Sequence, residues 1–140
     1  MTTNITNGGA SDQPDVIVLT VPATPRHAAT ARVVAASLAA DLGFDVDEID
    51  DLRLGLNEAV AVLADHEIDD ADDRLRIEFR TVPAGRGSAR IDVVVRRDHG
   101  TSATSSDLDE LAERILAAVV DQHEHRDGAI QLSKSSRGPG

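Results

Sequence analysis

Residues 50–59 read Asp-Asp-Leu-Arg-Leu-Gly-Leu-Asn-Glu-Ala and lie within a helical pattern that Asp45 can cap. One face of this helix is apolar and carries Ile49, Leu52, Leu56, Val60 and Leu63. A second row, Leu54, Glu58 and Val62, lies about 200° around the helix from Leu56. A helix that is apolar on two sides is expected between a sheet and another element. This arrangement places the carboxylate of Glu58 in an apolar row.

The segments on either side of this helix predict strands and one further helix. Residues 16–21 form a β-branched run that Pro22 closes, which is typical of a strand. Thr24 and Pro25 supply an N-cap and a first-turn proline for a helix that Gly43 ends. Apolar residues alternate with polar ones over 75–79 and again over 91–95, and this period of two predicts a hairpin.

The C-terminal part predicts a last helix and a last strand. The helix begins after Ser106 or Asp107 and ends at Gly128, and a short strand follows at 130–132. His123 and His125 then lie at a solvated helix end, because positions i and i+2 do not converge on a metal. The order β-α-α-β-β-α-β predicts an α+β fold, a two-layer sandwich of a mixed sheet with helices on one face.

The two ends of the chain lack a packing pattern. Residues 1–14 are rich in Thr, Asn, Gly and Ser, which predicts a disordered arm, and residues 135–140 predict a flexible tail. The folded domain is expected over 15–134. The segment 65–73 carries six carboxylates and is expected to be a solvated loop or a docking surface for a basic partner.

Composition excludes several classes of function. The 140 residues include 14 Lys and Arg against 25 Asp and Glu, giving a formal net charge of -11, which disfavours direct nucleic-acid binding. The chain has no cysteine, so a disulfide scaffold, a thiolate zinc site and a cysteine nucleophile are excluded. No apolar run approaches the roughly 20 residues that cross a bilayer, and we expect a cytoplasmic protein that does not bind membranes.

The stretch 50–59, the preceding Leu-Gly-Phe at 42–44 and the order of the elements resemble the anti-sigma-factor serine/threonine kinases. These belong to the histidine-kinase-like, or Bergerat-fold, ATPases, and the resemblance covers about residues 16–134. It implies that Glu58 is the general base of the N-box, the motif whose asparagine four residues later ligates Mg²⁺. It also implies that Asp98 accepts a hydrogen bond from adenine and that Gly100 lets backbone approach the nucleotide.

The sequence departs from this family pattern at three places. Val62 replaces the N-box asparagine, and Ser102 replaces the second glycine of the adenine motif. The phosphate-binding Gly-x-Gly-Leu would fall at 110–113, where Glu110 and Glu113 stand instead. Two carboxylates facing a triphosphate are unfavourable, since one pair of like charges at 4 Å costs about 1 kcal/mol even in water. ATP or ADP binding therefore stays open, Mg²⁺ binding is disfavoured, and no other metal site is expected.

Each candidate residue also has a purely structural interpretation. Glu58 can belong to a polar network with an arginine, and Asp98 and Gly100 can form an ordinary turn at the end of a strand. The leading hypothesis is an anti-sigma-type regulator, a homodimer that binds a sigma factor or an anti-sigma antagonist with weak or lost ATP binding. The alternative is an active ATP- and Mg²⁺-dependent serine kinase that phosphorylates the antagonist.

Overall fold

A computed structural model describes residues 15–64, 73–84, 87–97 and 110–137. The strands are β1 (Asp15–Pro22), β2 (Arg74–Val82), β3 (Arg90–Arg97), β4 (Gln122–Arg126) and β5 (Ala129–Ser135). The helices are α1 (Ala28–Asp41), which follows a 3₁₀ turn at Pro25–His27, α2 (Val46–Leu63) and α3 (Glu110–Val119). None of the helices in these ranges is both long and apolar enough to span a bilayer.

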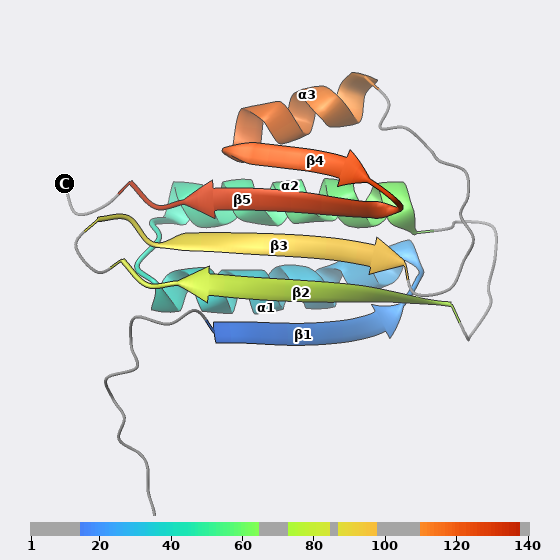
Figure 1. The fold of residues 1–140 in the computed structure, drawn as a ribbon, viewed down its shortest axis with the longest axis horizontal. Coiled ribbons are helices and arrows are strands. Elements are labelled where there is room, and N and C mark those ends of the chain that lie inside the picture. Colours follow the sequence, from blue (N-terminus) through green and yellow to red (C-terminus); the bar gives the residue numbers. More distant parts are fainter. Residues whose placement is uncertain (1–14, 65–72, 85–86, 98–109, 138–140) are drawn as a thin grey trace, which may run out of the picture.

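The strands form one sheet in the order β1-β2-β3-β5-β4, and α1 and α2 lie behind it in Figure 1. The expected two-layer α+β sandwich with helices on one face is therefore confirmed. The expectation of a mixed sheet is wrong in one respect, because all four pairings in the described sheet are antiparallel. Along the chain, α1 and α2 lie between β1 and β2. Helix α3 lies between β3 and the β4–β5 hairpin.

The core lies between the sheet and the helices and is built from small aliphatic residues. Along β2 and β3 every second side chain is buried, as the period of two predicts. Helix α1 contributes alanines, of which Ala31, Ala35 and Ala39 are fully buried. It ends before Gly43, whose φ of +87° is a backbone conformation that favours glycine.

Helix α2 begins with a reciprocal cap, as the sequence indicates at Asp45. The Asp45 carboxylate accepts a hydrogen bond from the Glu48 backbone N–H at 2.8 Å, and the Glu48 side chain accepts one from the Asp45 N–H, also at 2.8 Å. The expected Thr24 cap differs, since the Thr24 hydroxyl contacts Nδ1 of His27 at 3.1 Å and no backbone N–H.

The predicted extent of the last helix is wrong. The expected long helix ends at Val119, and residues 122–126 form β4, which a turn at Asp127 and Gly128 joins to β5. Both turn residues have positive φ, 54° and 76°, as a two-residue hairpin requires. The Asp-Gly pair thus makes a hairpin turn rather than a helix end.

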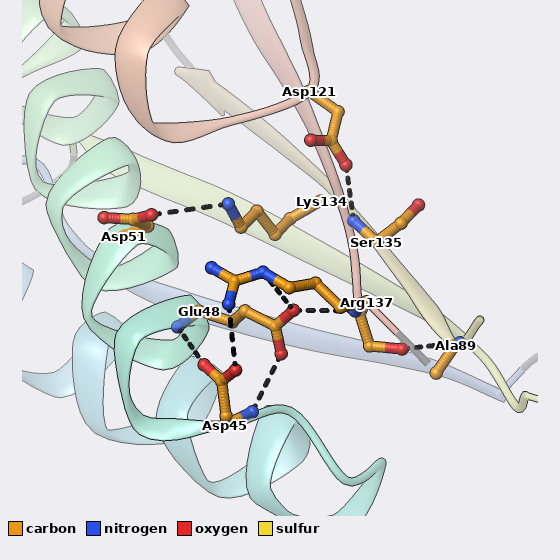
Figure 2. Close-up of polar contacts among 9 residues, drawn as sticks. Asp45, Glu48, Asp51, Ala89, Asp121, Lys134, Ser135 and Arg137 are labelled. Atoms are coloured by element: carbon orange, nitrogen blue, oxygen red, sulfur yellow. Dashed lines mark hydrogen bonds and ion pairs between the residues drawn. The ribbon is translucent and has the colours of Figure 1, made fainter. Parts of the chain in front are cut away.

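The expected flexible tail from residue 135 is also corrected, because the chain remains hydrogen-bonded as far as Arg137. Ser135 belongs to β5, and Ser136 and Ala89 exchange two hydrogen bonds of 2.9 and 3.0 Å. The Arg137 backbone N–H donates to Glu48 Oε2 at 2.7 Å, as Figure 2 shows. Glu48 is 3% exposed and so joins the start of α2 to the end of the sheet.

We predict that Glu48→Ala lowers the free energy of unfolding by about 1–3 kcal/mol, because the backbone N–H groups of Asp45 and Arg137 lose the charged acceptor that the buried Glu48 side chain provides. Chemical denaturation of the purified protein checks this value. Asp47→Ala is the matched control, since Asp47 lies in the same helical turn and is exposed. Equal losses in the two variants would show that the hydrogen bonds of the Glu48 side chain contribute nothing beyond the charge at the helix start.

Candidate functional site

Glu58 lies on the side of α2 that faces α3. A Cβ atom placed on Gly55 would meet Val119 and Val120, at the end of α3, so this side of α2 is turned toward α3. Glu58 and Val62 follow at i+3 and i+7 and share that side. The second apolar row expected from the sequence therefore has a partner element, although Leu54 is 45% exposed.

The Glu58 carboxylate is half-buried and makes no hydrogen bond or ion pair within the described ranges. The described residues therefore do not form the polar network between Glu58 and an arginine that was the structural alternative. A carboxylate in this setting keeps its acceptor capacity for a water, a substrate hydroxyl or a ligand.

The turn that follows Glu58 offers no metal ligand. Val62 is half-buried and packs against the core, so a hydrocarbon side chain stands where the family pattern has an amide. Asn57 does not substitute, because its Oδ1 accepts a hydrogen bond of 2.6 Å from Nη1 of Arg32 on α1. Mg²⁺ needs several oxygen ligands in near-octahedral geometry. Among the described residues no group of three or more His, Cys, Asp or Glu is arranged to hold a metal.

One corner of the molecule joins the ends of three elements through Arg97, the last residue of β3. Its guanidinium pairs with Asp73, next to the start of β2, with Nε 2.9 Å from Oδ2, and its Nη1 donates to the Leu63 carbonyl at the end of α2 at 3.2 Å. Asp73 is 9% exposed and is therefore part of this buried pair rather than of a solvated run. The remainder of the acidic run, 65–72, lies outside the described residues.

Asp98 and Gly100, the two residues expected at the adenine, also lie outside the described residues. Asp98 directly follows Arg97 in the sequence. The described part of β3 ends at Arg97, at the same end of the molecule as the C-terminal end of α2 (Figure 1).

The start of α3 carries carboxylates where the family has its phosphate-binding glycines. Glu113 Oε1 lies 3.0 Å from Nε2 of His123 on β4, and Glu110 lies 3.4 Å from Arg114 on the next turn. A free helix start attracts anions through its unpaired N–H groups. Here the carboxylates of Glu110 and Glu113 in the first turn of α3 would repel an anionic ligand such as a phosphate. His123 is also not at a solvated helix end, but on a strand, paired with Glu113.

Sequence reasoning found Glu58 but missed the Arg97 corner and the His123–Glu113 pair. The Asp-Gly at 127–128 is the signal that would have placed His123 on a strand, since this dipeptide is common in two-residue hairpins. No local pattern indicates that Arg97 pairs with Asp73, because the two residues are 24 positions apart in the sequence.

Comparison with known proteins agrees with this geometry. Residues 21–133 match the model of the histidine kinase-like ATPase domain. The chain belongs to this family. The match spans every described helix and extends from the end of β1 into β5. It includes α2 with Glu58, the Arg97 corner and the start of α3.

Two similar proteins support the resemblance to the anti-sigma-factor serine/threonine kinases. The serine-protein kinase RsbW of Halalkalibacterium halodurans is 33% identical over 58 residues, which is 41% of this chain and 36% of the kinase. The chain thus aligns with little more than a third of that relative. A crystal structure of the RsbU and RsbW domains of a Mycobacterium tuberculosis protein has a TM-score of 0.56 and 20% identity, over 89% of this chain and 32% of the other. This second similarity concerns the fold.

Proposed function

We propose that this protein is an anti-sigma-type regulator that binds a sigma factor or an anti-sigma antagonist in the bacterial cytoplasm, with weak or lost ATP binding. The observation that carries the proposal is Val62, packed against the core where the family has its magnesium-binding asparagine. The carboxylates of Glu110 and Glu113 at the start of α3 support it, since they disfavour a triphosphate at that position.

Charge supports a basic protein partner. The chain has a net charge of -11, and exposed carboxylates such as Asp47 and Asp50 on α2 and Glu110 on α3 lie on the helices. A sigma factor presents basic surfaces to DNA, and complementary charge accelerates and orients the encounter of two proteins. In this proposal the helical layer and the corner at Arg97 present the docking surface.

The second candidate function is an ATP- and Mg²⁺-dependent serine kinase. The half-buried Glu58 carboxylate, which has no partner among the described residues, favours it, because a general base needs a free acceptor atom. In this second function Glu58 removes the proton of the substrate serine, and Asp98 and Gly100 hold the adenine. A metal ligand other than residue 62 would then have to complete the site.

We predict little or no Mg²⁺-dependent binding of ATP or ADP to the wild-type protein, measured by titration calorimetry and thermal shift. A ligand with a Kd of about 10 μM, present at hundredfold excess over that Kd, would stabilise the protein by about 2.7 kcal/mol. We expect a much smaller effect. Val62→Asn restores the missing amide and should increase the Mg²⁺-dependent part of binding if residue 62 is what limits it.

Phosphate transfer separates the two candidate functions. Labelled ATP is incubated with the protein and with candidate antagonists from the same organism, using the wild type and Glu58→Gln. The regulator predicts no incorporation in either case. Incorporation by the wild type that Glu58→Gln abolishes would establish the kinase and overturn our ranking.

We predict that the protein binds a sigma factor of its host with an affinity that nucleotide does not change. Calorimetry with purified sigma factors measures this affinity, with and without ATP and Mg²⁺. Salt should weaken the complex, because surface charges are screened within about 8 Å at physiological ionic strength. Failure of every sigma factor and antagonist of the host to bind would contradict the proposed function.

We further infer that the chain forms a homodimer, the commonest symmetric assembly of soluble proteins. Size-exclusion chromatography with light scattering should then give about 30 kDa, twice the 14.8 kDa of one chain. A concentration-independent mass of one chain would show a monomer.

A further inference from the structure

One face of the sheet is uncovered by the described helices. In Figure 1 α1 and α2 lie behind the strands, and the front of the sheet carries no helix. The outward side chains of β2 and β3 alternate with the buried ones. They include five exposed arginines, and β4 adds a sixth. We call this surface the arginine face; its arginines are Arg74, Arg76, Arg80, Arg90, Arg96 and Arg126.

The arginine face has the opposite charge to the rest of the chain. It holds six of the 14 Lys and Arg, while its described acidic side chains are Glu78, Asp92 and Glu124, three of the 25 Asp and Glu. The face is therefore net positive on a protein whose net charge is -11. A cluster of one sign focuses the local field and attracts the opposite charge to that site.

The arginines of the two central strands are poorly neutralised within the protein. Arg76 and Arg96 are direct cross-strand partners in the β2–β3 register, and like charges directly opposite each other are destabilising. Asp92, which faces Arg80 across the strands, is engaged by Arg90 Nε at 3.1 Å and by the Ser133 hydroxyl at 2.7 Å. The side chains of Arg76, Arg80 and Arg96 form no ion pair or hydrogen bond with the residues that the structure describes.

Apolar side chains lie among these arginines. Val16 and Val18 on β1 are 48% and 44% exposed, and Val94 is half-buried between Arg96 and Asp92 along β3. A hollow of about 230 Å³ beside Val94 is lined by Arg96, Arg126 and Glu124 among others. Arginine is enriched at protein–protein interfaces, and these two strands carry several arginines on the open face.

We propose that the arginine face is a docking surface for an acidic segment of a partner protein. The carboxylates of that segment would pair with Arg76, Arg80 and Arg96, and its aliphatic side chains would contact Val18 and Val94. A second copy of this chain is a poor occupant, because the same face would bring arginines against arginines. Duplex DNA is also a poor occupant, since the net charge of the whole protein repels it.

This surface is separate from the proposed sigma-binding layer. It lies on the side of the sheet opposite α1 and α2, so it offers a second docking surface for a partner of opposite charge (Figure 1). The proposal does not depend on nucleotide binding or on Glu58. An experiment that tests the two faces separately therefore distinguishes failure of the arginine-face proposal from failure of the proposed function.

The test uses the full chain and a fluorescein-labelled peptide of alternating Glu and Val, with a Lys and Val peptide for comparison. Fluorescence anisotropy at low salt measures affinity, and backbone amide NMR shifts locate the peptide. We expect binding of the acidic peptide alone, with shifts in β2 and β3. Arg76→Glu with Arg96→Glu should weaken it about tenfold or more, the effect of about 1.4 kcal/mol.

The matched control is Arg53→Glu with Arg114→Glu, which changes the net charge equally at exposed helical sites. We expect this control to bind the acidic peptide like the wild type. Equal losses in both double variants, no binding by the wild type, or tighter binding of a DNA duplex would overturn the proposal. So would a change of oligomeric state in Arg76→Glu/Arg96→Glu, which would assign the face to a second copy.

A milder pair, Arg76→Gln with Arg96→Gln, keeps the test decisive if the reversed charges prevent folding. It should also weaken binding of the acidic peptide. Because it removes two like charges that face each other, it should raise the Tm relative to the wild type. A lower Tm together with unchanged peptide binding would show that the two arginines serve the fold instead.

Discussion

The absence of a side chain at residue 55 is the constraint on which the helical layer depends. A Cβ on Gly55 would lie 2.9 Å from Cγ1 of Val120 and 3.5 Å from Cγ2 of Val119, so α2 and the end of α3 approach too closely for any larger residue without a shift. The same atom would lie 3.7 Å from Leu132 on β5. The absence of a side chain at this position thus permits the close approach of α2 to the end of α3, whereas the distance to Leu132 is an ordinary van der Waals contact. Glu58, three residues later, takes its place beside α3 from that contact.

Local patterns in the sequence predict much of this fold. The alternation along β2 and β3, the Asp45 cap and the apolar face of α2 each depend on neighbours a few residues away, and the structure confirms them. Strand β4 shows where such reasoning stops. Its sequence is Gln-His-Glu-His-Arg, which has no apolar residue to reveal a period of two, and it is a strand because β5 pairs with it.

The candidate site could be predicted only where its residues are close neighbours in the sequence. Glu58, and the replacement of the family's asparagine by Val62, could be identified from the sequence because positions i and i+4 lie on one helix face. The pairs Glu48–Arg137 and Asp73–Arg97 join residues that are 89 and 24 positions apart, and each forms only when distant elements have packed. Asp98 and Gly100 lie outside the described residues, so their expected role at the adenine stays a prediction.

The anchored end of the chain has a practical consequence for attaching probes. Arg137 is held at the start of α2 and Ser136 at Ala89, at the end of the sheet opposite the Arg97 corner (Figures 1 and 2). A biotin or a solid support coupled through a side chain introduced at position 137 would therefore be held away from that corner. Immobilised through that position, the protein keeps the Arg97 corner open to solution.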